Sequence, residues 1–288
     1  MIRLTISIIT VFYLNNYSNA QFGSGNSSPK IDADKIIIYK ETNTTDLRLW
    51  VFNPEKMTSS NPAIIFFYGG GWRGGSPTQF QQQANYFLKK GFISILADYR
   101  VQKRDSTTPV EAVMDAKSAI RWIRKNSNIL GVDSNKIVAS GGSAGGYLAA
   151  STATVSYFNE SSDDLSISSK PNAMILFNPV IWISKSNDLQ NYLYELLGEN
   201  IDRLSPYKLV DKSVMPTIIF HGYDDETVSY KAVEQYDKKM KKLGIFSELH
   251  LYEGEGHGFF NYGRKSNVAF KDTMEKSYNF LKKIKFIK

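Results

Sequence analysis

The pattern of hydrophobic and polar positions alternates between short apolar runs and longer stretches with apolar residues three or four positions apart. The runs predict β-strands, and the longer stretches predict α-helices. The expected strands lie at residues 35–40, 47–52, 63–68, 92–98, 136–140, 173–177, 217–220 and 247–252, and the expected helices at 79–90, 109–124, 147–155, 228–243 and 268–287. This alternation predicts an α/β fold in which helices cover both faces of a mostly parallel sheet.

Two stretches do not follow this alternation. Residues 157–170 are polar and rich in serine, and residues 182–207 mix aromatic with polar side chains. Right-handed crossovers place the carboxyl ends of all parallel strands on one edge of the sheet. We expect both stretches to lie above that edge as a small lid or rim, where loops shape a substrate site.

The first twenty residues predict a processing signal. Arg3 precedes a short apolar stretch, and small residues lead up to Ala20. The apolar stretch is too short for an ordinary membrane-spanning helix. We therefore expect a signal peptide over residues 1–20, cleavage after Ala20, a disordered leader over 21–30 and one domain over 31–288. An uncleaved anchor or a buried N-terminal helix is the alternative.

Composition and charge limit the cellular locations and the classes of partner that we expect. The chain has no cysteine, which excludes disulfides, a thiol nucleophile and a thiolate metal site. With the signal, this predicts a secreted or periplasmic protein without stable membrane association after cleavage. The formal charge of +7 comes from scattered lysines without a compact basic motif, so we expect no nucleic-acid partner. A basic face is nevertheless suited to attract an acidic polysaccharide.

Ser143 is the candidate nucleophile. It lies in Gly141-Gly142-Ser143-Ala144-Gly145, which fits the pattern G-x-S-x-G between an expected strand and an expected helix. Small neighbours allow a sharp turn that exposes the serine hydroxyl at the helix N-terminus. A purely structural glycine-serine turn is the alternative.

A serine hydroxyl needs a base to accept its proton, and the chain has three histidines. His257 lies in a glycine-rich loop between the last expected strand and the last helix. His250 falls inside a strand, and His221 ends a strand, where it more plausibly orders a loop. The chain order serine, acid, histidine favours His257 as the general base.

The acid that orients the histidine is expected between Ser143 and His257, on a loop after a strand. Asp224, Asp225 and Glu226 are adjacent at such a position. We choose Asp225, with Asp224 as the alternative. After another expected strand, Gly69-Gly70-Gly71 supplies flexible backbone for an oxyanion hole, to which Ala144 adds the amide that follows the nucleophile.

The chain resembles the esterase and lipase branch of the α/β-hydrolases, which includes hormone-sensitive-lipase-like enzymes and bacterial acetylxylan and feruloyl esterases. The matching stretches are Phe67-Tyr68-Gly69-Gly70-Gly71-Trp72, Ala97-Asp98-Tyr99-Arg100, Gly141–Gly146, His221-Gly222-Tyr223-Asp224-Asp225 and Gly256-His257-Gly258-Phe259. The resemblance implies an α/β-hydrolase domain over 31–288, Asp225 as the acid, and Gly70, Gly71 and Ala144 as oxyanion donors. One departure is Tyr68, which stands where the family usually has a histidine that braces this loop.

The resemblance implies a serine carboxylic-ester hydrolase that needs no metal or organic cofactor. It further implies a small-molecule or polysaccharide ester as substrate, such as an acetyl or feruloyl ester of xylan. Two alternatives remain. The turn around Ser143 also resembles that of prolyl-oligopeptidase-like exopeptidases, although their N-terminal propeller is missing. Tyr68 favours a non-catalytic carbohydrate-binding relative. The sequence predicts neither the acyl group nor the oligomeric state.

Overall fold

The structure is a computed structural model that describes residues 30–183 and 188–287. The expected signal peptide (1–20), its cleavage site and nearly all of the expected leader (21–30) lie outside the described residues. Within the described ranges, no helix combines the length and the apolar character needed to cross a bilayer.

An eight-stranded sheet forms the centre of the described part of the molecule, in the order β1-β2-β4-β3-β5-β6-β7-β8. Only the pairs β1–β2 and β2–β4 are antiparallel, and the other pairs are parallel. Strands such as β3 are buried along almost their whole length, as expected when helices cover both faces. The strands are β1 Lys35–Lys40, β2 Leu47–Phe52, β3 Asn61–Phe67, β4 Ile93–Ala97, β5 Val132–Gly142, β6 Ala173–Phe177, β7 Thr217–Gly222 and β8 Ser247–Tyr252.

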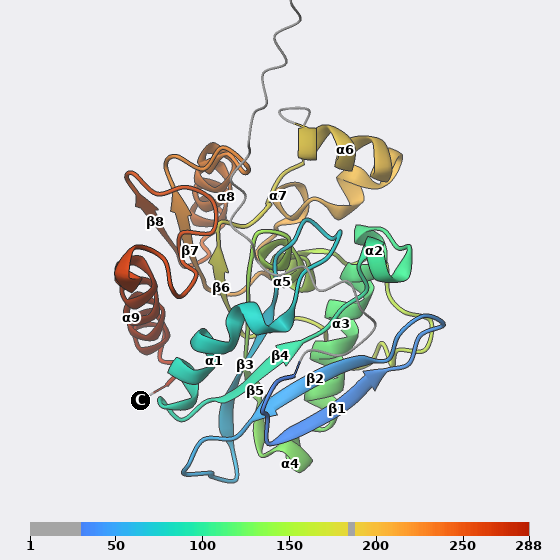
Figure 1. Ribbon diagram of the computed structural model, residues 1–288, viewed down its shortest axis with the longest axis vertical. Helices are drawn as coiled ribbons and strands as arrows, with labels where there is room; N and C mark the ends of the chain where they lie inside the picture. The colour runs from blue at the N-terminus through green and yellow to red at the C-terminus, as the bar shows by residue number, and fades with distance from the viewer. Residues whose placement is uncertain (1–29, 184–187, 288) are drawn as a thin grey trace, which may run out of the picture.

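The longer helices pack on the two faces of this sheet. Helices α1 and α9 lie on one face, and α3 packs against α5 on the other (Figure 1). The start of α3 is fixed locally, because Thr108 and Glu111 form a capping box around Pro109. These helices are α1 Gln81–Leu88, α3 Pro109–Lys125, α5 Ala144–Thr154, α8 Tyr230–Lys242 and α9 Val268–Lys283. The predicted α/β fold is confirmed.

Residues 182–207, expected as part of a lid or rim, contain short helices near the carboxyl end of β6 (Figure 1). Two contacts hold them there. The Tyr207 amide donates to the Ile181 carbonyl (3.2 Å), and the Tyr147 hydroxyl from α5 donates to the Leu204 carbonyl (2.8 Å). The remaining helices of the described residues are η1 Pro77–Phe80, α2 Gln102–Asp105, α4 Ser127–Leu130, α6 Asp188–Leu197, η2 Gly198–Leu204, α7 Pro206–Leu209 and η3 Lys265–Asn267.

Apart from Tyr157 and Phe158, whose ring centroids lie 4.5 and 5.0 Å from the guanidinium carbon of Arg203, residues 157–170 do not form the rim that the sequence suggested. They run along the outside of α3, where Arg121 binds Asp163 at 2.7 Å and Arg124 donates to the Lys170 carbonyl at 2.9 Å. The reason is topological. Helix α5 carries the chain back across the sheet before this segment begins, and β6 starts just after it ends. That part of the lid prediction was wrong.

Candidate active site

The turn between β5 and α5 holds Ser143 in an unusual backbone conformation, with φ 54° and ψ −119°. Such a conformation is costly for a residue with a side chain and persists only where its surroundings enforce it. Here the surroundings are close backbone contacts that only glycine permits. A Cβ added to Gly145 would lie 2.0 Å from the Phe67 carbonyl oxygen, and one added to Gly141 would lie 2.4 Å from the Gly145 carbonyl oxygen.

Three side chains from distant parts of the sequence form one hydrogen-bonded line. His257 Nε2 lies 3.0 Å from Ser143 Oγ, and His257 Nδ1 lies 2.8 Å from Asp225 Oδ2. The other carboxylate oxygen, Asp225 Oδ1, accepts the amides of Thr227 and Val228 at 3.0 and 2.8 Å. The Asp225 side chain is fully buried, whereas that of His257 remains 27% exposed. The predicted nucleophile, base and acid are thus brought together at the carboxyl ends of the strands.

The carboxyl group of Asp225 is held in its ionised form. Burial alone would raise its pKa, but hydrogen bonds from His221 and His257, the charge of His257 and the Val228 amide together hold the pKa well below its usual range. An ionised Asp225 can accept the Nδ1 proton of His257 and stabilise the imidazolium that forms when Nε2 takes a proton.

The structure also distinguishes the candidates that the sequence left open. Asp224 is exposed, and its backbone amide donates to the Glu255 carbonyl at 3.0 Å, so it is Asp225 that reaches His257. His221 is buried and orders the loop as expected, with Nε2 2.8 Å from the Val228 carbonyl. His250 stacks on Phe220 with ring centroids 5.5 Å apart, the packed position expected for a histidine inside a strand.

The glycine loop after β3 lies directly against the nucleophile. A Cβ added to Gly69 would lie 3.3 Å from the Ser143 Cβ. Gly70 and Gly71 both have positive φ, of 135° and 61°. Within the described residues, their amides donate to no other protein group, and Ala144, as the first residue of α5, has no intrahelical acceptor for its own. Three N–H groups therefore remain available beside Ser143.

Tyr68 holds this loop from the buried side. Its hydroxyl donates to Asp98 Oδ1 at 3.0 Å, and its ring stacks on Tyr99 with centroids 4.2 Å apart. The Tyr99 hydroxyl in turn donates to the Tyr68 carbonyl at 2.7 Å, and Arg104 binds Asp98 at 2.9 Å. Burial raises the pKa of Tyr68 well above its usual value, so the phenol stays a proton donor. The bracing function that the departure from the family pattern put in question is present.

Three polar residues that sequence reasoning missed surround the site. Asn178 accepts the Gly258 amide at 3.0 Å, Gln79 accepts the Gly69 amide at 2.6 Å, and Asn261 donates to the Gly258 carbonyl at 2.9 Å. Each is a single amide side chain in a loop or short helix, without a motif that points to it. Only the tertiary contacts reveal these residues.

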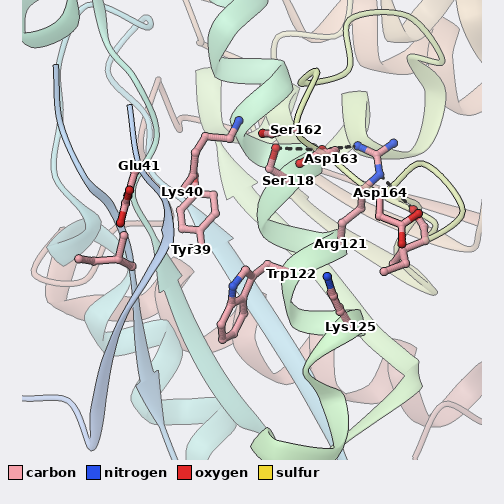
Figure 2. A pocket seen from close by; sticks show the side chains of 12 residues that line it. Tyr39, Lys40, Glu41, Ser118, Arg121, Trp122, Lys125, Ser162, Asp163 and Asp164 are labelled. Carbon is pink, nitrogen blue, oxygen red and sulfur yellow. Dashed lines mark hydrogen bonds and ion pairs between the residues drawn. The ribbon is translucent and has the colours of Figure 1, made fainter. Parts of the chain in front are cut away.

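Two hollows lie in other parts of the described molecule. One, of about 480 Å³, lies between β1 and α3 (Figure 2) and is lined by Ile38, Tyr39, Lys40, Glu41, Ser118, Arg121, Trp122, Lys125, Ser162, Asp163, Asp164 and Ile167. The other, of about 610 Å³, is lined by Trp182, Ile183, Tyr194, Gly198, Glu199, Ile201, Asp202 and Lys208. Two residues before Trp182, the Val180 amide donates to the Ser143 carbonyl at 3.3 Å, so the segment that leads to the second hollow starts beside the turn of the nucleophile.

Comparison with protein families matches the BD-FAE family model over residues 49–240, about two thirds of the chain. This chain belongs to the BD-FAE family. The BD-FAE match includes Ser143 and Asp225, and a second match, to the dienelactone hydrolase family over residues 202–285, includes His257. Both agree with the α/β-hydrolase fold and with membership of its esterases.

Several solved and curated relatives of this BD-FAE chain are esterases. Esterase 2 of Thermogutta terrifontis, phosphonylated by sarin, is 42% identical with a TM-score of 0.87, over 90% of this chain and 98% of that one. An acetylxylan esterase of Xylanibacter ruminicola is 28% identical over 72% of this chain and 42% of its own length. Esterase LipC of Mycobacterium tuberculosis is 26% identical over 70% and 54%. The chain spans about half the length of the curated relatives it matches.

Proposed function

We propose that this protein is a serine carboxylic-ester hydrolase that works through an acyl-enzyme. The observation that carries the proposal is the hydrogen-bonded line from Asp225 through His257 to Ser143, which ends on a partly exposed serine in a strained turn. A serine hydroxyl becomes a useful nucleophile when a positioned base accepts its proton. That base is itself oriented by a buried carboxylate, as such catalysis requires.

The geometry supports two balanced steps. Ser143 Oγ attacks the ester carbonyl and gives its proton to His257 Nε2, while the amides of Gly70, Gly71 and Ala144 donate to the developing oxyanion. The tetrahedral intermediate collapses, and the alcohol leaves with the proton from His257. Water then attacks the acyl-enzyme with His257 again as base, which releases the acid and restores the Ser143 hydroxyl.

The reaction class is tested with p-nitrophenyl acetate. Wild type is expected to hydrolyse it, and Ser143→Ala to lose about 10⁴- to 10⁶-fold in kcat, because the hydroxyl that attacks is gone. Unchanged circular dichroism serves as the control for folding. Wild-type activity confined to aminoacyl-nitroanilides would favour the exopeptidase. Substrate binding without hydrolysis would favour the non-catalytic relative.

For the substrate, we infer a short acyl group carried by a polysaccharide of the xylan type. Two relatives support this. One is the acetylxylan esterase, and the other is esterase 2, which has been solved with propionate and with butyrate bound. The inference also agrees with a positively charged chain, which is suited to an acidic polysaccharide.

We infer that the hollow lined by Trp182 takes a sugar of the polysaccharide. Trp182 stacks on Tyr207 with centroids 5.1 Å apart and 13° between the ring planes. Lys239 fixes Tyr207 by donating to its carbonyl at 2.7 Å. A rigid aromatic wall bordered by polar groups such as Glu199 and Asp202 suits a ring with an apolar face and many hydroxyls.

The substrate is tested by measuring acetate and ferulate separately after incubation with acetylated and feruloylated xylan. We expect acetate. Trp182→Ala should raise KM for acetylated xylan without a comparable change for p-nitrophenyl acetate. Trp122→Ala, in the hollow of Figure 2, is the matched control and should change neither. Release of neither acid from any polysaccharide would refute the substrate proposal and leave the reaction class intact.

We also propose that the protein is secreted or periplasmic. The support is the signal pattern over residues 1–20 and the absence of cysteine from the sequence. Fractionation of the native host and N-terminal sequencing of the mature protein test it. Gln21 is the expected first residue, and a cytoplasmic chain that begins at Met1 would overturn the proposal.

A further inference from the structure

A chain of side-chain amides joins the glycine loop to the loop that carries His257. Gln79 Oε1 accepts the Gly69 amide at 2.6 Å, and Gln79 Nε2 donates to Asn261 Oδ1 at 3.2 Å. Asn261 Nδ2 donates to the Gly258 carbonyl at 2.9 Å. Gln79 and Asn261 lie 182 residues apart in the sequence, so nothing but the fold brings them together.

The two backbone groups at the ends of this series, the Gly69 amide and the Gly258 carbonyl, fix the direction of every hydrogen bond in it. The Gly69 amide can only donate, so it must face the oxygen of Gln79, which turns the Gln79 NH₂ group toward Asn261. The Gly258 carbonyl can only accept, so it must face the NH₂ group of Asn261, which turns the Asn261 oxygen toward Gln79. Both requirements are met at once, and neither amide can be flipped without breaking two contacts.

We propose that Gln79 and Asn261 are positioning residues that hold the oxyanion loop and the histidine loop in register. Gly69 precedes the two proposed oxyanion donors of its loop and lies against Ser143, while Gly258 follows His257. A shift at either end would therefore move the N–H donors relative to the imidazole. This inference rests on the proposed esterase activity and concerns how the oxyanion loop and the histidine loop of that site are aligned.

A positioning role predicts a particular kinetic signature. Oxyanion donors act on charge that develops in the transition state, so their displacement lowers kcat more than it raises KM. Misplacement by about 1 Å can cost about 100-fold, and we expect Gln79→Ala and Asn261→Ala to lower kcat by about 10- to 100-fold with little change in KM. Gln79→Glu keeps the acceptor for Gly69 but removes the donor to Asn261 and adds charge, so it should also lower kcat.

The experiment measures kcat and KM for p-nitrophenyl acetate in wild type, both single variants and the double variant. If the two amides act as one bridge, the double variant loses no more than the worse single variant. Gln81→Ala is the matched control. Gln81 Nε2 also donates to an asparagine, Asn85 (3.4 Å), but this pair lies within α1 and joins no loops. Its kcat should equal that of wild type.

A transition-state analogue separates positioning from a general loss of structure. The inhibition constant of an aryl trifluoromethyl ketone, which forms an oxyanion on Ser143, should rise in proportion to the fall in kcat/KM. Single variants with wild-type kcat, or losses that add in the double variant, would overturn the inference. A wild type without esterase activity would instead refute the proposed function, so the two failures remain distinguishable.

Discussion

The site around Ser143 and the hollow between β1 and α3 both gather acidic, basic and hydroxyl side chains, but they use them differently. In the hollow, Arg121 donates to Asp163 at 2.7 Å (Figure 2). It also donates to Asn159 at 2.8 Å and to the Ile167 carbonyl at 3.0 Å. Lys40 likewise lies between Asp115 and Glu160. The hydrogen-bonding groups of these two cations are directed at protein partners.

Around Ser143 the polar side chains instead form a line of hydrogen bonds, and the last group of that line, the Ser143 hydroxyl, is left for a further molecule. Asp225 binds His257, and His257 binds the Ser143 hydroxyl. The glycine loop beside Ser143 carries two amides, those of Gly70 and Gly71, that donate to no protein group among the described residues. A cluster whose groups are paired with each other stabilises the fold. A cluster that leaves a nucleophile and N–H donors for a further molecule is arranged for chemistry. Substitutions around Ser143 should therefore lower kcat, whereas substitutions in the hollow should lower the free energy of unfolding.

After the loss of the Ser143 hydroxyl itself, the largest effect is expected at Asp225, the carboxylate that orients His257. Asp225→Asn should lower kcat by about 10⁴-fold, because an amide no longer holds the His257 tautomer whose Nε2 can accept a proton. The check is kcat for p-nitrophenyl acetate. Asp224→Asn, the exposed neighbour, is the control and should behave as wild type. A loss of less than tenfold in Asp225→Asn would mean that this carboxylate does not orient the base.

The same variant has a pH signature in stability. Because the pKa of Asp225 is held well below its usual value, the ionised group contributes stability that is fully present above about pH 4. This contribution is lost as the pH falls through the folded-state pKa. Urea unfolding of wild type and Asp225→Asn should therefore converge as the pH is lowered below about 4. A constant difference down to the acid transition would contradict this.

Substitutions in the hollow between β1 and α3 should lower the free energy of unfolding and leave kcat unchanged. Arg121→Ala leaves Asp163, whose side chain is only 12% exposed, without its cation, and we expect a cost of about 2–4 kcal/mol in the free energy of unfolding. Lys208→Ala, which breaks the exposed pair with Asp202, should cost about 0–1 kcal/mol. Urea titration measures both. A large drop in kcat of folded Arg121→Ala would show that this cluster is coupled to the site.

The contrast also explains what the sequence predicted well. Ser143 and His257 lie in glycine-rich turns whose spacing reflects local backbone geometry. Consecutive residues determine such geometry, so it can be recognised in the sequence. The order of strands and loops placed the acid among Asp224, Asp225 and Glu226, and the family resemblance pointed to Asp225. Strand centres and the start of α3 were predicted for the same reason, since hydrophobic period and capping are local properties.

The bridging amides and the position of residues 157–170 were not predictable in this way. Gln79 acquires its role only because the fold sets it between Gly69 and Asn261. Strand β5 likewise begins at Val132, four residues before the expected start, because it pairs there with Asn61 across a register shift. Helix α2 spans only four residues, too few to show an apolar period, and it is held by backbone hydrogen bonds to Trp72 and Arg73. Long-range partners decided each of these features.

The last expected effect concerns Lys117, a buried cation of α3 that forms no ion pair within the described residues, unlike Arg121 on the same helix. Its ammonium group donates to the Tyr157 carbonyl at 2.7 Å, and burial lowers the pKa of Lys117 to about 8. In the unfolded chain a lysine titrates at about 10.4, so between about pH 8 and 10.4 the unfolded state binds more protons and stability rises with pH.

Lys117→Met should lack this rise, and exposed Lys125→Met on the same helix should keep it. Urea unfolding at about pH 7.5, 9 and 10 measures the slope for each protein. Equal slopes in wild type and Lys117→Met would show that the buried ammonium group is charged throughout this range.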